Sequence, residues 1–304
     1  MRLVWSLVVL ASFASPSSNA VHIGDLQLRA YGLMIALGVF AAVWLSQKRC
    51  PARNIDPLAI QILALRAVPA GLIGSRVYHV ATDWRSFQGR WIDVFKIWQG
   101  GLGIPGGMFA GVVVGVLYAR RMGLHTGDLV DVVAPSLPLA QAIGRIGNWF
   151  NQELFGRPSK LPWAVRIDPQ HRPVRYANET SFQPTFLYEM LWNLALVVFL
   201  LWLDRKKVIP RGRLLAVYVI GYGVGRLWIE LLRVDPAGHL LGVRVNVWVS
   251  LVAIGGGALW LAMPRRRGAV AAPTHGEPDD EPDDELAHDP ELDDELEPEA
   301  EVSE

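Results

Sequence analysis

The sequence predicts an all-α polytopic membrane protein with about seven transmembrane helices, and its composition and charge pattern are the reasons. Hydrophobic residues make up 51% of the 304 residues and charged residues only 19%, with 12 tryptophans. Several apolar runs approach the length of about 20 residues that a helix needs to cross a bilayer. Clusters of Lys and Arg close alternate runs, as they do at the cytoplasmic ends of membrane helices. A soluble globular domain is therefore excluded.

The expected spans alternate in direction. Basic clusters follow the first, third, fifth and seventh apolar runs, at residues 48–53, 120–121, 205–207 and 265–267. This alternation requires the N-terminus outside and the C-terminus in the cytoplasm. The expected spans are residues 28–45, 58–80, 102–118, 129–146, 186–203, 214–232 and 245–263.

Residues 1–21 form a separate N-terminal segment before the seven-span domain, which we place at 22–264. One arginine, a short apolar core and small residues ending at Ala20 resemble a signal peptide. An interfacial helix and a translation start assigned too far upstream are equal alternatives. Each of the three allows the following segment to begin on the extracytoplasmic side of the membrane.

A C-terminal tail, residues 265–304, differs sharply from the rest in charge. All 29 basic residues precede residue 277, whereas 16 of the 29 acidic residues lie from Glu277 onward. Residues 1–276 thus carry a formal excess of 16 positive charges, which the 16 acidic residues from Glu277 onward balance. The tail is rich in Pro, Asp and Glu and has almost no apolar residues to bury, so we expect a disordered acidic cytoplasmic tail.

The stretch 141–157 is the most unusual in the chain, because a polar cluster follows directly on the fourth apolar run. It places Arg145 between Gly144 and Gly147. A charged side chain near bilayer depth is costly unless it is paired or faces water. Glycines let a backbone approach a ligand closely, and a guanidinium presents a planar fork of donors that suits phosphate oxygens. The stretch predicts a polar pocket for an anionic group at a membrane face; the alternative is an ordinary helix end with interfacial Arg and Trp.

The loop 148–185, expected outside, is basic against the usual charge rule. Its positive charge favours an anionic ligand, although a surface that binds lipid headgroups is an equal interpretation. The basic residues of this loop are Arg157, Lys160, Arg166, Arg172 and Arg175.

Charged residues also lie inside other expected spans. Arg226 and Glu230 are four residues apart, so they share one face of a helix. An ion pair inside a membrane is a functional candidate by default, and the alternative is a structural pair that fixes helix packing. Glu189 lies at the start of the fifth span, where it either pairs with an arginine or complements the helix N-terminus. Tyr31, alone, is typical of an interfacial aromatic anchor.

No metal, cofactor or nucleic-acid partner is expected. The seven histidines show no metal-ligand spacing, and the single cysteine, Cys50, excludes a disulfide framework or a thiolate cage. The glycine-rich stretch 100–107 lacks the lysine of a nucleotide-binding loop and follows no strand.

Residues 144–157 resemble the signature of the bacterial prolipoprotein diacylglyceryl transferase family, and the resemblance extends over about 22–263. It implies a seven-span fold with a small extracytoplasmic head in the bacterial plasma membrane. Further blocks that resemble the family, in the family's order, lie at 31–34, 74–78, 100–102, 131–135, 184–189 and 221–230.

The resemblance also implies an activity. The diacylglyceryl group of phosphatidylglycerol passes to the lipobox cysteine thiol of a prolipoprotein, and glycerol phosphate leaves. The expected partners are phosphatidylglycerol, prolipoprotein lipobox segments and the lipid bilayer. The resemblance assigns phosphatidylglycerol binding to Arg145, Asn148, Glu153 and Gly156, and catalysis to Tyr31, Arg226 and Glu230.

Two departures from the family pattern leave alternatives open. Pro105 and Gln183 stand where the family often has histidines, the first of which has been treated as a base for the thiol. An inactive homologue is one alternative. A lipid or small-anion transporter is another, because intramembrane arginines and broken spans suit it. Against a transporter, no paired-half repeat is evident and the polar residues gather toward the outer face.

Overall fold

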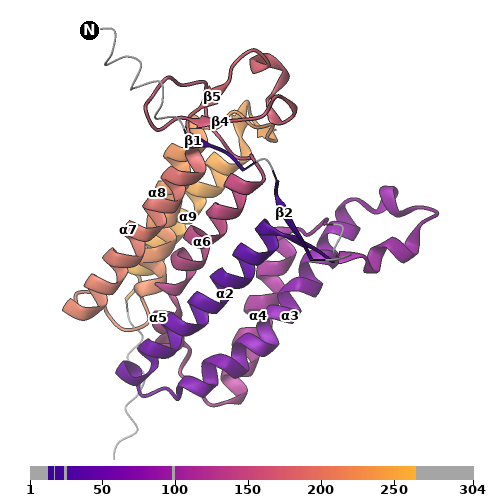
Figure 1. The fold of residues 1–304 in the computed structure, drawn as a ribbon. Helices are drawn as coiled ribbons and strands as arrows, with labels where there is room; N and C mark the ends of the chain where they lie inside the picture. Colours follow the sequence, from indigo (N-terminus) through magenta and orange to yellow (C-terminus); the bar gives the residue numbers. More distant parts are fainter. Residues whose placement is uncertain (1–12, 17, 24–25, 98–99, 265–304) are drawn as a thin grey trace, which may run out of the picture. The chain divides into compact units, whose positions relative to one another are not determined.

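The computed structural model describes residues 13–16, 18–23, 26–97 and 100–264, and it is dominated by long helices (Figure 1). The predicted helical membrane fold is confirmed. The acidic tail and most of the signal-like segment lie outside the described residues. The α-helices are α2 Ala30–Arg49, α3 Pro57–Thr82, α4 Ile104–Arg121, α5 Thr126–Val133, α6 Ser136–Phe150, α7 Thr185–Lys206, α8 Leu214–Leu232 and α9 Val245–Ala262.

Six stretches of the described chain are long and apolar enough to cross a membrane. The remaining expected span, the third at 102–118, corresponds to α4, an 18-residue helix that ends in Arg120 and Arg121. The fourth expected span is not a single helix, since α5 and α6 are separated by a turn at Ala134 and Pro135. Proline lacks the N–H that a continuous helix needs and restricts the residue before it.

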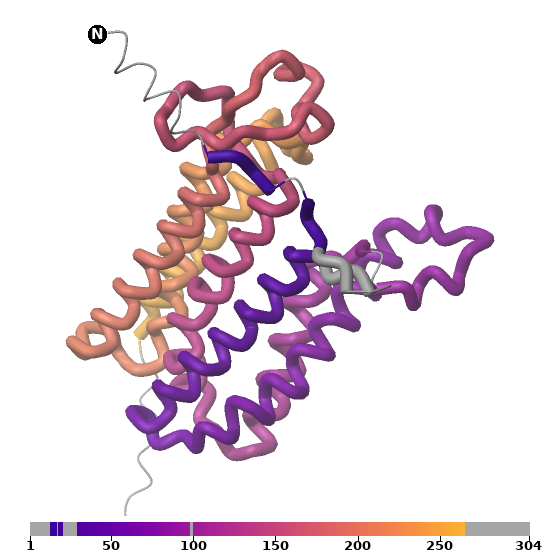
Figure 2. Tube along the Cα trace, in the orientation of Figure 1, coloured from indigo at the N-terminus to yellow at the C-terminus, as the bar shows by residue number. Residues whose placement is uncertain are grey.

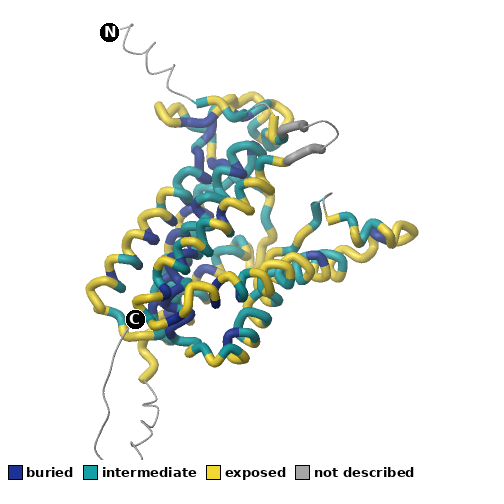
Figure 3. The backbone as a smooth tube through the Cα atoms, turned by 60° about the horizontal axis from the view of Figure 1, so that its bottom comes forward, coloured by how far each residue is buried: buried dark blue, intermediate teal, exposed yellow. Residues whose placement is uncertain are grey.

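Many helix positions are exposed (Figure 3), and large apolar side chains occupy many of these positions. Phe40, Phe109 and Val252 are 69, 73 and 73% exposed. Exposure of this kind is unfavourable in water and natural in lipid. Polar groups are turned inward instead: Ser46 Oγ donates a hydrogen bond of 2.8 Å to Ser136 Oγ between α2 and α6.

Small residues allow the helices to pack closely, as is usual in membranes. A Cβ atom added to Gly38 of α2 would lie 3.0 Å from the carbonyl oxygen of Ala140 in α6. At Gly74 of α3, it would lie 2.4 Å from the Cβ of Ala110 in α4. The helices α3 and α4 accordingly lie side by side as a hairpin (Figure 2).

A partly buried ion network links the helix ends at one end of the bundle, and the sequence analysis did not anticipate it. Asp204 at the end of α7 accepts hydrogen bonds from Arg49 (3.0 Å) and from Arg53. Arg53 also lies 3.1 Å from Asp131 of α5, whose other oxygen accepts from the backbone N–H of Leu214 at 2.9 Å. The ends of the first and fifth expected spans therefore meet, as the alternation of basic clusters requires.

A small head covers the other end of the bundle (Figure 1). Its sheet has the order β1-β4-β5, with Phe13 of β1 beside Val165 of β4, and Val165 opposite Phe182 of β5. Phe155, Val165, Ile167, Phe182 and Phe186 form part of its core. The strands are β1 Phe13–Ala14, β2 Ala20–Ile23, β3 Leu26–Arg29, β4 Val165–Arg166, β5 Ser181–Phe182, β6 His239–Leu240 and β7 Val243–Arg244. Short 3-10 helices are η1 Cys50–Arg53, η2 Trp84–Phe87, η3 Trp91–Phe95, η5 Pro169–His171 and η6 Val174–Tyr176.

Candidate functional site

Three helices bring two arginines and a glutamate together beneath the head. Arg145 lies near the C-terminal end of α6, Glu189 at the start of α7 and Arg226 near the C-terminal end of α8. Because α6 and α8 run toward the head and α7 runs away from it, these positions come to the same level of the bundle (Figure 1). Arg145 and Glu189, which are 44 residues apart, form an ion pair.

Glu189 bridges the two arginines. One carboxylate oxygen, Oε1, accepts a hydrogen bond from Arg145 Nη2, and Oε2 lies 3.5 Å from Arg226 Nη1. The glutamate side chain is almost wholly buried, whereas those of Arg145 and Arg226 are 18 and 14% exposed. A guanidinium has five N–H donors, more than these contacts use. The two arginines can therefore bind an anion while they remain held in place by Glu189.

Asn148 connects Arg145 to Glu153. Its Oδ1 accepts a hydrogen bond of 3.1 Å from Arg145 Nη1, and its Nδ2 donates one of 2.8 Å to Glu153 Oε1. Asn151 Nδ2 donates to the same glutamate oxygen at 3.1 Å. Asn148 thus links the guanidinium of Arg145 to Glu153, and the binding of phosphatidylglycerol by Asn148 and Glu153 stays a prediction.

Tyr31 packs against the same part of α6. A Cβ atom added to Gly147 would lie 2.6 Å from the Cδ2 atom of Tyr31, so glycine is required for this close approach. Tyr31 is near enough to Glu153 and Arg145 to interact with both charges. Beside them, a Cβ atom at Gly144 would meet no other atom within 4 Å, which leaves open space next to the α6 backbone.

Glu230 is fully buried and surrounded by positive and polar groups. Its Oε2 lies 2.9 Å from Arg226 Nη2, as expected from their spacing on α8. Its Oε1 accepts hydrogen bonds from Arg244 Nε at 2.6 Å and from Asn246 Nδ2 at 3.2 Å. Arg233 Nη1 lies 3.7 Å from Oε2. The sequence analysis missed Arg244 and Asn246, whose only signal was a polar pair at the start of the seventh apolar run.

Gly156 lies against protein backbone and side chains. Its N–H donates to the carbonyl of Gln183 at 2.8 Å, and an added Cβ atom would lie 2.9 Å from Thr185 Cγ2 and 3.1 Å from the carbonyl oxygen of Leu232. The glycine permits the head to pack on α7 and α8. The close contacts of Gly156 in the structure are thus with other segments of the protein, and its assignment to phosphatidylglycerol binding stays a prediction.

Two of the loop arginines donate hydrogen bonds to backbone carbonyls, either within the head or in the segment after α8. Arg172 donates to the carbonyls of Ile167 (2.8 Å) and Ala177 (3.1 Å), and Arg175 donates to that of Val234 at 2.9 Å. Their charges remain near the outer surface, but their donors are partly committed to backbone carbonyls.

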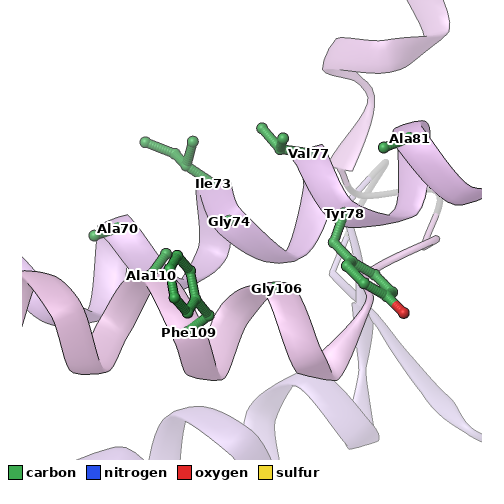
Figure 4. Close-up of a pocket in the computed structure, with 9 residues that line it drawn as sticks. All are labelled: Ala70, Ile73, Gly74, Val77, Tyr78, Ala81, Gly106, Phe109 and Ala110. Atoms are coloured by element: carbon green, nitrogen blue, oxygen red, sulfur yellow. The ribbon is translucent and has the colours of Figure 1, made fainter.

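The hairpin of α3 and α4 contributes no comparable anion site among its described residues. Arg76, inside α3, donates hydrogen bonds to four backbone carbonyls of the loop that follows, those of Asp93, Val94, Gly100 and Gly101. A cavity of about 580 Å³ on this hairpin is apolar apart from one tyrosine hydroxyl (Figure 4). Its lining residues are Ala70, Ile73, Gly74, Val77, Tyr78, Ala81, Gly106, Phe109 and Ala110. Such a lining does not suit a phosphate.

Comparison with known proteins assigns the chain to a family. The prolipoprotein diacylglyceryl transferase family matches residues 18–263, which is most of the chain. The chain belongs to the prolipoprotein diacylglyceryl transferase family. Three relatives, each named phosphatidylglycerol–prolipoprotein diacylglyceryl transferase, come from Frankia casuarinae, Frankia alni and Cutibacterium acnes. Their identities to this chain are 49, 46 and 45% over 261, 262 and 259 residues. The aligned region covers 85, 85 and 84% of this chain, and 63, 69 and 88% of the respective relatives.

Both departures from the pattern expected of a prolipoprotein diacylglyceryl transferase lie outside the arginine cluster. Pro105 is in the first turn of α4, where proline is well tolerated. The backbone of Gln183 pairs with Arg157 and Gly156. Among the described residues, no group of three or more His, Cys, Asp or Glu could hold a metal ion.

Proposed function

We propose that this protein transfers the diacylglyceryl group of phosphatidylglycerol to the lipobox cysteine thiol of prolipoproteins and releases glycerol phosphate. The observation that carries the proposal is the pair of partly exposed arginines, Arg145 and Arg226, bridged by buried Glu189. The names of the relatives supply the two substrates. Arg145 also lies within residues 144–157, the signature that resembles the family.

The two guanidinium groups hold the phosphodiester of the lipid. Arg145 uses one Nη1 hydrogen for Asn148 and one Nη2 hydrogen for Glu189, so three of its five N–H donors remain for phosphate oxygens. Arg226 is committed to Glu189 and Glu230 and retains donors of its own. Since their carboxylate partners are buried, the arginines need little reorganisation when the lipid binds.

In the transfer step, the cysteine sulfur attacks the glyceryl carbon that carries the phosphate. A C–S bond forms as the C–O bond breaks, and the electron pair of that bond leaves on the phosphate oxygen. Glycerol phosphate therefore acquires a second negative charge while the thiol loses its proton. Arg145 and Arg226 stabilise the charge that develops on the phosphate, and this preorganised electrostatic effect is the main catalytic contribution of the site.

The thiol ionises through the positive potential of the arginines. Glu230 already accepts from Arg244 and Asn246 and contacts Arg226, and Glu153 accepts from two amides. Carboxylates bound in this way are weak bases. Nearby arginines lower the pKa of a thiol and so populate the thiolate that attacks.

The proposal includes a location and a domain arrangement. The protein resides in the bacterial plasma membrane with its N-terminus and head outside and its C-terminus in the cytoplasm, because basic clusters close alternate spans. The seven-span domain, 22–264, carries the chemistry, and the tail, 265–304, is a cytoplasmic extension. Labelling with an impermeant thiol reagent in intact cells tests this: Ser159→Cys should react, and labelling of Ser303→Cys would reverse the assignment.

Mass analysis of a synthetic lipobox peptide tests the activity. The peptide is incubated with membranes that contain the protein and phosphatidylglycerol. A thioether-linked diacylglyceryl adduct is expected, and it should be missing when the lipobox cysteine is replaced by serine. Movement of phosphatidylglycerol between leaflets without an adduct would favour the transporter alternative, and neither result would indicate an inactive homologue.

A further inference from the structure

Arg244 lies outside the arginine cluster of the site and forms an ion pair with Glu230. Arg244, immediately before α9, donates from Nε to Glu230 Oε1 at 2.6 Å and from Nη1 to the carbonyl oxygen of Asp235 at 3.1 Å. Its side chain is 17% exposed and that of Glu230 is fully buried. An ion pair shielded from solvent in this way is weakly screened by salt, so its charge balance acts on neighbouring groups.

The charges that surround Glu230 form two neutral pairs. Arg233 makes two hydrogen bonds to the carboxylate of Asp235, at 2.6 and 2.8 Å. Arg244 and Glu230 form the second pair through the short Nε contact. The cross contacts between the pairs are longer, at 3.7 Å from Arg233 to Glu230 and 3.4 Å from Arg244 to Asp235.

The remaining members of the network are Arg145, Glu189 and Arg226, which together carry one positive charge. A phosphodiester carries one negative charge, so the trio and the ligand are balanced. Without Arg244, the buried charge of Glu230 would be compensated by Arg226, which is 2.9 Å away. The two site arginines would then face two carboxylates, and their attraction for an anion would be cancelled.

Glu153 does not alter this balance directly. Its carboxylate is bound by the amides of Asn148 and Asn151, so that Asn148 separates it from Arg145. Glu230 is different, because it contacts Arg226 itself. The net charge that a ligand meets at the arginines thus depends on how completely Glu230 is neutralised.

We propose that Arg244 is a positioning and specificity-determining residue, which neutralises Glu230 so that the anion site keeps a net positive charge. The site thereby prefers glycerophospholipids with a negatively charged headgroup over zwitterionic ones. Arg244 acts through Glu230 and Arg226 and does not itself touch the lipid. The inference rests on the proposed function only for the identity of the lipid, since the charge argument applies to any ligand with a net negative charge, whereas the ammonium group of a zwitterionic lipid cancels the charge of its phosphodiester.

The test measures lipid binding separately from turnover. Purified full-length protein is mixed with phosphatidylglycerol and phosphatidylethanolamine of identical acyl chains, and the ratio of the two affinities is determined by competition. Arg244→Gln should reduce this ratio about tenfold, which corresponds to ~1.4 kcal/mol. Turnover on lipobox peptide should show the same change as a higher KM for phosphatidylglycerol, with a smaller change in kcat.

Charge restoration separates this role from a purely structural one. The double variant Arg244→Gln with Glu230→Gln removes both charges, so its preference for phosphatidylglycerol should return toward that of the unmodified protein. Arg244→Lys should also retain most of the preference for phosphatidylglycerol, because it keeps the positive charge. Arg175→Gln is the matched control, because Arg175 likewise donates to a backbone carbonyl beside the head, that of Val234 at 2.9 Å. Its affinity ratio should be unchanged.

Two results would overturn the inference: an unchanged affinity ratio in Arg244→Gln, or a double variant no better than the single one. If Arg244→Gln does not fold, Arg244→Lys and the double variant still decide the matter, because a structural role predicts that the double variant fails as well. A protein that prefers phosphatidylglycerol but transfers nothing would refute the proposed function and leave the role of Arg244 intact.

Discussion

Replacing Arg145 by lysine keeps the positive charge and removes the planar fork, so it tests whether the site reads phosphate geometry. In the native site, Nη1 donates to Asn148 at 3.1 Å and Nη2 donates to Glu189. An ammonium has three donors on a single atom. If it keeps the contact with Glu189, it cannot also reach Asn148 and present two parallel donors to the phosphate.

The size of the effect follows from the two phosphate hydrogen bonds that a lysine cannot form. At about 1.5 kcal/mol for each charge-assisted hydrogen bond, their absence amounts to ~3 kcal/mol, or about a hundredfold in kcat/KM. We expect Arg145→Lys to approach Arg145→Ala in transfer to a lipobox peptide, with both proteins inserted in the membrane at normal levels. The assay is the initial rate of adduct formation by mass spectrometry. A lysine variant within about threefold of the native rate would refute bidentate recognition, because a point charge would then be sufficient.

Three further predictions concern other parts of the molecule. Truncation after Arg267 should leave turnover nearly unchanged at equal membrane abundance, because the acidic tail lies outside the part of the chain that resembles the family; a large loss would assign the tail a role in the reaction. Pro105→His should give little gain in transfer rate. The rate should rise with pH as the substrate thiol ionises, at a pKa lowered by the arginines. A rate that follows the titration of a carboxylate at acidic pH would instead identify a carboxylate base. Asp204→Asn should lower the melting temperature, since it leaves Arg49 and Arg53 without their shared carboxylate. Because these pairs are partly exposed, the loss should be smaller than the ~3–5 kcal/mol for breaking a fully buried ion pair. An unchanged melting temperature would show that the network is not stabilising.

The sequence was sufficient for the helices because apolar runs of bilayer length leave few other structures possible. Six of the expected spans match single described helices to within a few residues. The fourth did not, since the apolar pattern continues through Pro135 whereas the structure has a turn at Ala134 and Pro135. A run of apolar residues indicates that a segment lies in the membrane, but it does not indicate where the backbone hydrogen bonds of the helix are interrupted.

The site was predictable only where its residues are neighbours on one helix. Spacing on α8 was enough to pair Arg226 with Glu230, and the structure has that pair at 2.9 Å. By contrast, the contacts of Glu189 with Arg145 and Arg226 join residues 44 and 37 positions apart on different helices. Spacing left Glu189 with two possible roles for this reason. Arg244 gave still less signal, since its partner Glu230 precedes it across a turn between two helices.

Arg76 shows that a charge inside an apolar run can be bound by the protein's own backbone. An arginine within a membrane span indicates function by default. Here it is buried and donates to four backbone carbonyls of the loop between α3 and α4. Those carbonyls have no sequence signature, so the presence of an arginine in an apolar run does not by itself reveal that its partners are backbone groups.

Quantifying both products in the same vesicles tests the central claim most directly. Purified protein is reconstituted with a lipobox peptide into vesicles of phosphatidylglycerol, and diacylglyceryl peptide and free glycerol phosphate are measured together over time. We predict that the two appear at equal rates, and that neither appears in vesicles of phosphatidylethanolamine alone. Release of glycerol phosphate without the adduct, or redistribution of the lipid without either product, would contradict the assignment of this protein as a diacylglyceryl transferase.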